Sequence, residues 1–480
     1  MMQKPWETVI GLEVHVQLAT DTKAFCDCPA VFGAEPNVHS CPICLGQAGT
    51  LPKLNQQAVE LALRAALALN CQIAPTLAFD RKHYEARDLP KGYQITQWRY
   101  PLGKDGYIDI DVEGKIQRIP IRQVHLEEDA GRAVQVVDRE IIDFNRAGIP
   151  LLEVVTPPVF TTGAEARAYL EALQLLLRYL GVSDCRIEEG SMRCEANISL
   201  RPQGSDAMGE LCEIKNIGSF RGVVGAIAYE ERRQASLLQA GQPVPRETRR
   251  WDEARQETVP MRSKEQAADY QYRPEPDLPA QPIAPERLEK IKGNLPELPL
   301  ERQARYISQL GLSPQAAKEI VSDLALAAYF EEVLSHYRSA VEVANWLLTD
   351  LRALLNQAGR SYADCPVSPV ALAELLELVQ QGVINQTMGK ELLGESFATG
   401  QSPAALVKAR QLQQVNDPEK LKGWIDEVLR QHAAVVAEYQ SGKTKVFGFL
   451  VGQVMRLSAG AANPHLVNQL LRQALARHGS

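Results

Sequence analysis

The chain has 480 residues, of which 45% are hydrophobic and 23% charged, a composition typical of soluble globular proteins with two to four domains. Its net charge of −7 argues against a general nucleic-acid-binding protein. The sequence has no run of eighteen apolar residues and no signal-peptide core near its N-terminus. We therefore expect a cytoplasmic protein with no membrane span and no secretion.

The charge is distributed unevenly along the chain. Residues 421–480 contain seven Lys and Arg but three Asp and Glu, whereas the remainder contains 45 and 56 and has a net charge of −11. An acidic body with a basic tail is typical of a protein whose tail contacts a polyanion. Scatter in surface charge explains the same counts equally well.

The first predicted element is a β-strand over residues 10–18, IGLEVHVQL. Apolar and polar residues alternate, which places Leu12, Val14, Val16 and Leu18 on one face and Glu13, His15 and Gln17 on the other. A carboxylate and an imidazole two residues apart on one strand face are close enough to bind a single ion.

Four cysteines follow in two close pairs, Cys26-x-Cys28 and, after twelve residues, Cys41-x-x-Cys44. The pattern suits tetrahedral zinc, and four thiolates leave no open coordination position, so we predict a structural Zn²⁺ site that staples a long loop. Four buried free thiols are the alternative. Redox chemistry is disfavoured because no strand–helix unit frames the Cys-x-x-Cys pair. We interpret the isolated cysteines as packing residues: Cys71, Cys185, Cys194, Cys212 and Cys365.

The segment VHLEEDAG, residues 124–131, complements the first strand. Glu127 and Glu128 are adjacent and point to opposite faces of a strand, so one of them joins a site with Glu13 and His15. Carboxylates with an imidazole and room for water suit Mg²⁺ or Mn²⁺. A salt-bridged sheet face explains the same residues.

Two further segments, residues 79–97 and 188–200, gather cationic and polar side chains: Arg81, Lys82, Tyr84, Lys91, Arg193 and Asn197. Cations beside a metal site are what phosphoryl transfer needs. For any one of these residues, a surface ion pair is the simpler interpretation. We find no P-loop, because the GKT at 442–444 lacks the upstream glycine, and no amidase or hydrolase nucleophile motif.

The remaining elements indicate an α+β protein that becomes helical toward its C-terminus. Alternation predicts strands at YIDIDVEG and RAVQVVDREIIDF, and residues 161–181 predict a helix that Thr162 and Glu165 cap. Seven prolines between Arg273 and Pro299 predict a linker. Beyond it, four helix starts place proline directly after a capping residue, at Ser313, Ser368, Ser402 and Asp417.

A resemblance to a known family extends from about Trp6 to the end of the chain, in order and without a large gap. IGLEVHVQL, FDRKHY, LPKGYQITQ, VHLEEDAG, DFNRAGIPLLEVV, VSDCRIEEGSMRCEANISL, EIKNIGSF, ETRRWDE and GFLVGQVMRLSAGAANPHLVNQLL resemble the B subunit of the aspartyl/glutamyl-tRNA(Asn/Gln) amidotransferase. That family converts Glu-tRNA(Gln) to Gln-tRNA(Gln) and Asp-tRNA(Asn) to Asn-tRNA(Asn).

The resemblance implies three domains: an N-terminal cradle domain related to glutamine synthetase (1–293), a helical domain (294–407) and a helical tail that contacts tRNA (408–480). It also implies two protein partners in a heterotrimer, an amidase subunit that frees ammonia from glutamine and a small third subunit. The chain itself would act as a carbon–nitrogen ligase: ATP phosphorylates the side-chain carboxylate of the tRNA-borne Glu or Asp, and ammonia then displaces the phosphate.

The site residues implied by the matching motifs are these. Glu13 and His15 bind Mg²⁺ together with Glu127 or Glu128, of which we favour Glu128 as the ligand and catalytic residue. Lys82 and Tyr84 lie near the phosphates and act in catalysis, and the nucleotide is bound by Lys82, Tyr84, Arg193, Asn197 and Lys215. The four clustered cysteines match a zinc site found in part of the family.

Two positions depart from the family pattern. Residues 84–94 read YEARDLPKGYQ where the family reads close to YFYPDLPKGYQ, and residues 269–279 read DYQYRPEPDLP where it reads DYRYFPEPDLP. We expect aromatic packing to be lost at both. Two alternatives are an archaeal relative specific for Gln-tRNA, whose inserted domain does not fit in 480 residues, and a zinc-stapled tRNA-binding adaptor with a non-catalytic cradle.

Overall fold

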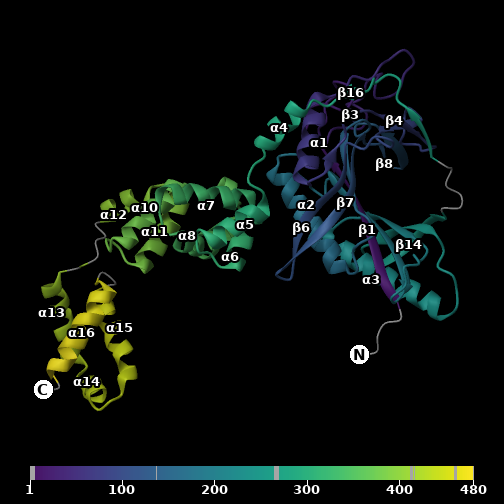
Figure 1. Ribbon diagram of the computed structural model, residues 1–480. Helices are drawn as coiled ribbons and strands as arrows, with labels where there is room; N and C mark the ends of the chain where they lie inside the picture. Colours follow the sequence, from purple (N-terminus) through teal and green to yellow (C-terminus); the bar gives the residue numbers. More distant parts are fainter. Residues whose placement is uncertain are drawn as a thin grey trace. The chain divides into compact units, whose positions relative to one another are not determined.

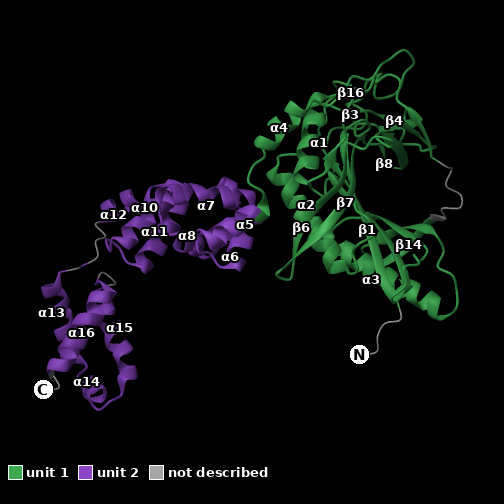
Figure 2. Ribbon diagram, viewed as in Figure 1, with its two compact units in different colours: residues 1–300 green, residues 301–480 purple. Residues whose placement is uncertain are grey.

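The computed structural model describes residues 6–136, 138–263, 270–410, 415, 417–458 and 462–478. The chain forms two compact units, Met1–Leu300 and Glu301–Ser480 (Figure 2). The first unit therefore extends beyond the predicted end of the cradle at 293. It contains all the described strands, and the second unit is helical, which confirms the predicted α+β fold class.

A nine-stranded sheet dominates the first unit (Figure 1). Its order is β14 (Glu257–Ser263), β13 (Glu247–Asp252), β12 (Cys212–Ile217), β11 (Met192–Pro202), β1 (Trp6–Gln17), β10 (Pro150–Val155), β7 (Lys115–Glu128), β6 (Gly103–Val112) and β2 (Gln72–Ile73). Neighbours are antiparallel except β12 and β13. The predicted first strand is confirmed as β1 and lies between β10 and β11, at the middle of the sheet.

Helices α1 (Gln56–Ala68), α2 (Gly163–Tyr179) and α3 (Phe220–Gln239) belong to the same hydrophobic core as the apolar side chains of β1. Leu12, Val14 and Val16 are at most 1% exposed, so burial of this face holds the sheet register. The predicted capping box of α2 is present, since Thr162 accepts from the Glu165 amide and Glu165 accepts from the Thr162 amide.

Three small sheets complete the first unit: β15 (Gln271–Pro274), β4 (Asp80–His83) and β5 (Tyr93–Thr96); β16 (Gln281–Pro282) and β3 (Thr76–Leu77); and β8 (Arg132–Val136) and β9 (Arg139–Asp143). The predicted linker is thereby wrong over its first part. Pro274 and Pro282 lie in edge strands, where a missing N–H is tolerated, and Pro285 begins α4 (Pro285–Gly293).

The second unit consists of helices with short connections: α5 (Pro299–Ser308), which begins two residues before the unit boundary, α6 (Pro314–Val321), α7 (Leu324–His336), α8 (Ala340–Trp346), a π-helical turn (Leu347–Leu351), α9 (Arg352–Ala358), α10 (Pro369–Gln380), α11 (Gln386–Thr399), α12 (Pro403–Arg410), α13 (Pro418–Gln431), α14 (Ala433–Gln440), α15 (Phe447–Leu457) and α16 (Pro464–His478). All four predicted starts are confirmed, because each capping side chain accepts a hydrogen bond from the first turn of its helix: Ser313, Ser368, Ser402 and Asp417.

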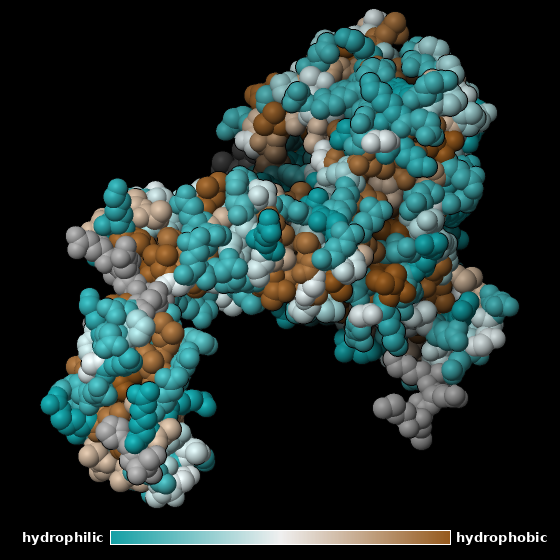
Figure 3. All heavy atoms as spheres, turned by 60° about the vertical axis from the view of Figure 1, so that its left-hand side comes forward, coloured by the Kyte–Doolittle hydropathy of each residue, from teal (hydrophilic) through white to brown (hydrophobic). Residues whose placement is uncertain are grey.

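The last four helices enclose a hydrophobic core of their own, from Leu421 to Leu475. The predicted division at 408 stays a prediction, since compactness groups both helical parts in one unit. On the face shown in Figure 3, hydrophobic side chains reach the surface of the tail among hydrophilic ones. Within the described part of the chain, no helix is both long enough and apolar enough to cross a bilayer.

Candidate functional site

The face of the nine-stranded sheet opposite the apolar face of β1 is lined with charged side chains. In the antiparallel register, His15 of β1 lies opposite Glu153 of β10 and Arg193 of β11, and Glu13 lies opposite Glu195. Directly opposed residues point to the same side of a sheet. Three neighbouring strands therefore bring carboxylates, an imidazole and a guanidinium together on one surface.

The centre of this surface is a cluster of Glu13, His15 and Glu153, whose ligand atoms all lie within 4.8 Å of one another. His15 Nε2 is 3.6 Å from Glu13 Oε1 and 3.8 Å from Glu127 Oε1. The prediction that Glu13 and His15 share a site is thus supported by their placement. Sequence reasoning missed Glu153: it is a lone carboxylate in the apolar run PLLEVV, and only the register shows that it faces His15.

The structure places Glu127, and not the favoured Glu128, beside His15, so the choice of Glu128 as the metal ligand stays a prediction that the geometry does not favour. Glu128 accepts hydrogen bonds from the Lys91 ammonium and the Ile95 amide (2.8 Å for the latter), away from the cluster. Glu127 lies beside His15 and accepts a hydrogen bond from the Thr96 hydroxyl at 2.9 Å. Successive side chains of β7 point to opposite faces of the sheet, so Glu127 and Glu128 lie on different faces. The register with β10 places Glu127 on the same face as His15.

Burial and mutual proximity shift the pKa values of the groups in the cluster. Burial, with the nearby carboxylates of Glu153 and Glu195, raises the pKa of Glu13 to about 9, and burial with Glu153 raises the pKa of Glu127 to about 7. Burial also disfavours ionised Glu153, but the hydrogen bond with His125 and the nearby His15 outweigh it and hold the Glu153 pKa below its usual range. Burial lowers the pKa of His15, which keeps the imidazole available as a ligand.

His125 supports the cluster from β7. Its Nδ1 lies 3.0 Å from Glu153 Oε2, and the side chain is 5% exposed. Its Nε2 is buried and has no hydrogen-bond partner among the described residues. The contact of His125 Nδ1 with Glu153 fixes the orientation of this carboxylate, as carboxylates at metal sites are commonly fixed by a second layer of hydrogen bonds.

Three of the polar residues predicted to bind nucleotide lie on the strands beyond β1, whereas Lys91 is bound to Glu128 and Arg81 is paired with Glu275 and Asp277. Arg193 donates to the buried Asp129 at 2.9 Å, and Lys215 of β12 donates to Glu195 at 2.6 Å. Asn197 is paired with Gly11 in the β1–β11 register, two positions along β11 from Glu195. Two of the residues predicted to bind nucleotide, Arg193 and Asn197, thus lie on β11 beside β1, and Lys215 lies on the next strand, β12.

Lys82 and Tyr84 approach from the three-stranded sheet. Burial opposes the Lys82 charge, but Glu127 and other neighbouring groups outweigh it and raise the Lys82 pKa. Its ammonium lies 5.7 Å from the Tyr84 ring centroid and 4.8 Å from that of Tyr270. Tyr84 contacts Tyr270 edge to face at 5.5 Å, and the expected loss of aromatic packing at residues 85–87 and 271–273 stays a prediction.

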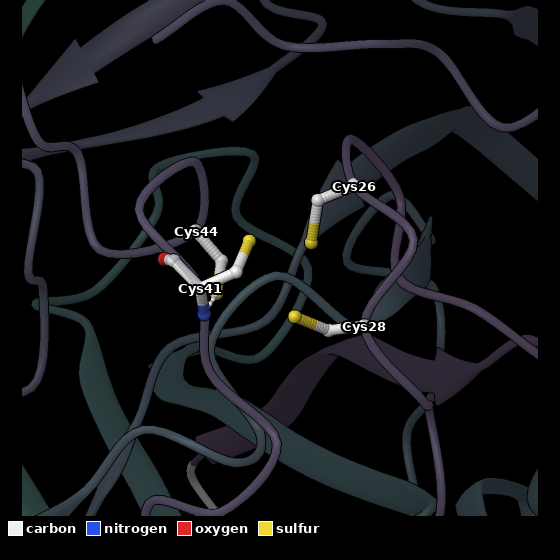
Figure 4. Close-up of side chains that lie close together, drawn as sticks. All are labelled: Cys26, Cys28, Cys41 and Cys44. Carbon is white, nitrogen blue, oxygen red and sulfur yellow. Dashed lines mark hydrogen bonds between the residues drawn. The ribbon is translucent and has the colours of Figure 1, made fainter.

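The cysteine cluster is local in sequence and is confirmed as a cluster. The Sγ atoms of Cys26, Cys28, Cys41 and Cys44 all lie within 4.8 Å of one another, and the labelled side chains converge from two segments of the long loop between β1 and α1 (Figure 4). Such a closed set of four thiolates fits a tetrahedral metal ion. Of the isolated cysteines interpreted as packing residues, four are buried and Cys365 is half-buried.

Lys23 is a basic residue of the cysteine site that the sequence did not reveal. It is fully buried, and its Nζ donates to the carbonyl oxygens of His39 at 2.7 Å and Phe144 at 3.1 Å, and lies 3.7 Å from Cys44 Sγ. A hydrogen bond from Cys26 lowers the pKa of Cys44 to about 4. Burial partly opposes this shift, and the charge of Lys23 adds to it. The ammonium therefore offsets thiolate charge and ties the loop to the segment before β10.

Comparison with known proteins defines the class. Residues 8–289 match the family model described as "GatB/GatE catalytic domain", and residues 328–475 match the one described as "GatB domain". The first match covers the polar cluster and the cysteine site together.

Curated relatives over the full length share one name, that of the B subunit of the aspartyl/glutamyl-tRNA(Asn/Gln) amidotransferase. The chain is 47% identical to that of Carboxydothermus hydrogenoformans over 99% of this chain and 100% of the relative. It is 48% identical to that of Moorella thermoacetica over 98% and 100%. The chain therefore belongs to the family of aspartyl/glutamyl-tRNA(Asn/Gln) amidotransferase B subunits, as the motifs indicated.

Proposed function

We propose that this chain performs the ATP-dependent step of tRNA transamidation in the cytoplasm. It phosphorylates the side-chain carboxylate of Glu on tRNA(Gln), or of Asp on tRNA(Asn), and the resulting acyl phosphate is amidated by ammonia. The observation that carries the proposal is the cluster of Glu13, His15 and Glu153 with Glu127 beside it. The names of the relatives supply the tRNA and the amido transfer.

The donor set of the cluster fits Mg²⁺. Carboxylate oxygens are the preferred protein ligands of this ion. Burial and the neighbouring carboxylates raise the Glu13 pKa, and a bound cation would favour the ionised carboxylate. Glu13, His15 and Glu153 would hold the ion, with Glu127 as a further ligand or as an acceptor for a bound water. When bound, Mg²⁺ neutralises charge on the phosphate oxygens.

Cationic residues of the chain would orient the phosphates and the substrate carboxylate. Lys82 is held near Glu127 and Glu153 and against tyrosine rings, so its charge is fixed beside the place where phosphoryl transfer would occur. Lys215 and Arg193 are anchored by Glu195 and Asp129 and keep donors for the nucleotide. Preorganised charges of this kind stabilise a transferring phosphoryl group at little reorganisation cost.

Protein partners complete the reaction. The chain would receive ammonia from an amidase subunit, and a small third subunit would complete the heterotrimer. The name of the relatives supports such partners, because it describes one subunit of a larger enzyme. The cysteine cluster would bind a structural Zn²⁺, since four thiolates leave no open position. The basic helical tail would contact tRNA.

The test is amidation of Glu-tRNA(Gln) and Asp-tRNA(Asn) by this chain co-purified with its amidase and small subunits, with ATP, Mg²⁺ and glutamine. Product on either tRNA, coupled to release of ADP, supports the proposal and gives the tRNA specificity. Bound tRNA without product or ADP contradicts it and favours the non-catalytic adaptor.

A further inference from the structure

A stacked aromatic pair, an exposed tryptophan against a half-buried tyrosine, lies beside the candidate site and has no role in the chemistry described above. The rings of Trp98 and Tyr272 are stacked, with centroids 4.4 Å apart and planes inclined by 16°. Trp98 is nevertheless 54% exposed. Tyr272 covers one face of the indole, so the opposite face is open to solvent.

The backbone under Trp98 is held in place by buried polar groups. Asp80, which is 1% exposed, accepts from the Trp98 amide at 3.0 Å, and from the Arg99 amide and Nε at 2.9 and 2.7 Å. The fully buried Gln97 accepts from the Leu126 amide at 2.8 Å and donates to the Ala78 carbonyl at 3.1 Å. A ligand that stacks on Trp98 therefore loses little free energy in ordering the ring.

The stack is next to the residues proposed to handle phosphate. Tyr272 of β15 lies directly opposite Lys82 of β4 in the sheet register, so both side chains point to one side. Thr96 of β5 lies opposite Asp80 of β4, and Asp80 is on the same side of β4 as Lys82. Because the Thr96 hydroxyl donates to Glu127 of β7, this side of the small sheet faces β7. Burial raises the pKa of the Tyr272 hydroxyl, which lies close enough to Lys82, Glu153 and Glu127 to sense their charges.

We propose that the open face of Trp98 is the surface on which the adenine ring of a substrate stacks while Lys82 and the carboxylate cluster handle its reacting end. Flat purine rings stack well on indole, and an exposed, preorganised aromatic next to fixed cations is typical of nucleotide-binding surfaces. The next residue, Arg99, is 45% exposed and is ion-paired with the buried Asp80.

This inference rests on the proposed function, in which adenine has two sources: ATP, and the adenosine at the 3′ end of the tRNA. Both present the same base at one end and a reacting phosphate or carboxylate at the other. The stack fits either source, and the experiment separates them.

The test uses the co-purified complex with Trp98→Ala, Trp98→Phe or Tyr100→Ala in this chain. Tyr100 is a matched control, since it is two residues away and 56% exposed. Calorimetry measures the affinity for Mg·ADP, and filter binding measures the affinity for intact tRNA and for tRNA that lacks its terminal adenosine. Far-UV circular dichroism and gel filtration check folding and subunit association.

We expect Trp98→Ala to weaken one adenine ligand about tenfold or more, Trp98→Phe to retain most of the affinity, and Tyr100→Ala to have no effect. Weaker Mg·ADP binding identifies the nucleotide as the source, and weaker binding of intact but not truncated tRNA identifies the terminal adenosine. Unchanged binding of all three probes by Trp98→Ala overturns the proposal, as does a loss of subunit association alone. If the wild-type complex binds tRNA but turns over no ATP, the proposed function itself fails.

Discussion

The two candidate metal sites of the first unit are built in opposite ways. The cysteine cluster is drawn from residues 26–44 of one loop, whereas the carboxylate cluster collects Glu13, Glu127 and Glu153 from three strands. The first is a closed set of four thiolates, and the second combines hard oxygen ligands with cations at its edge. Closed thiolate sites stabilise folds, and oxygen-rich sites beside cations suit phosphoryl chemistry. In this chain, the candidate site that is easier to find in the sequence is therefore the one that we propose to be structural.

The largest expected effect is on the carboxylate cluster. Replacing Glu153 by Gln removes a negative ligand while keeping its volume, so we expect amidation to fall by about a hundredfold or more. Steady-state amidation with saturating Mg²⁺ measures this effect. Zinc content and the glutaminase activity of the partner should be unchanged. An active Glu153→Gln complex would mean that the cluster is a salt-bridged sheet face.

The same experiment on neighbouring glutamates sharpens the assignment. We expect Glu127→Gln to weaken the apparent affinity for Mg²⁺ in the amidation assay roughly tenfold or more, because Glu127 lies 3.8 Å from His15. Glu128→Gln should leave the Mg²⁺ dependence near that of the wild type, since Glu128 is bound to Lys91 and the Ile95 amide. A larger loss of Mg²⁺ affinity for Glu128→Gln than for Glu127→Gln would instead support Glu128 as the metal ligand, as expected from the sequence.

At the cysteine site, the expected effect falls on metal retention. Lys23→Met removes the charge beside Cys44 and two hydrogen bonds to carbonyls, so we expect zinc to be lost to a chelator about 10- to 100-fold more readily. Zinc release to a colorimetric chelator measures it. Lys23→Arg keeps the charge and distinguishes this role from simple packing.

Lys53→Met is the matched control, because Lys53 is 78% exposed and its Nζ lies 3.9 Å from the exposed Asp27. It should release zinc at the wild-type rate. Equal release by all three variants would show that Lys23 has no part in holding the metal.

A smaller effect is expected for the tail. Deletion of residues 421–480 removes seven Lys and Arg and an independent hydrophobic core, so tRNA affinity should fall about tenfold at physiological salt. Affinity for Mg·ADP should change little. Filter binding over a series of salt concentrations should show a shallower salt dependence, and an unchanged tRNA affinity would exclude the tail from tRNA recognition.

The smallest effect is expected for His125→Gln. His125 acts through its hydrogen bond with Glu153, so amidation should fall several-fold with a higher Mg²⁺ requirement. Amidation rates measured over a series of Mg²⁺ concentrations separate the two quantities. A lower kcat with an unchanged Mg²⁺ requirement would contradict a positioning role.

The sequence by itself determined what depends on local spacing. Alternation gave the two faces of β1, the two cysteine pairs gave the thiolate cluster, and Ser–Pro and Asp–Pro pairs gave the starts of four helices. These features follow from side-chain period, ligand spacing within one loop and capping chemistry, which act over a few residues.

Only the tertiary structure decided which distant residues meet. The pairing of β10 between β1 and β7 brought Glu153 to His15 and placed Glu127, rather than Glu128, on the same side of the sheet as His15. The first part of the proline-rich segment was expected to be a linker, but it forms edge strands. One of them, β15, carries Tyr272, which stacks against Trp98. The physical reason is that strand register and edge position are fixed by burial of the whole apolar face, which no short segment of the sequence specifies.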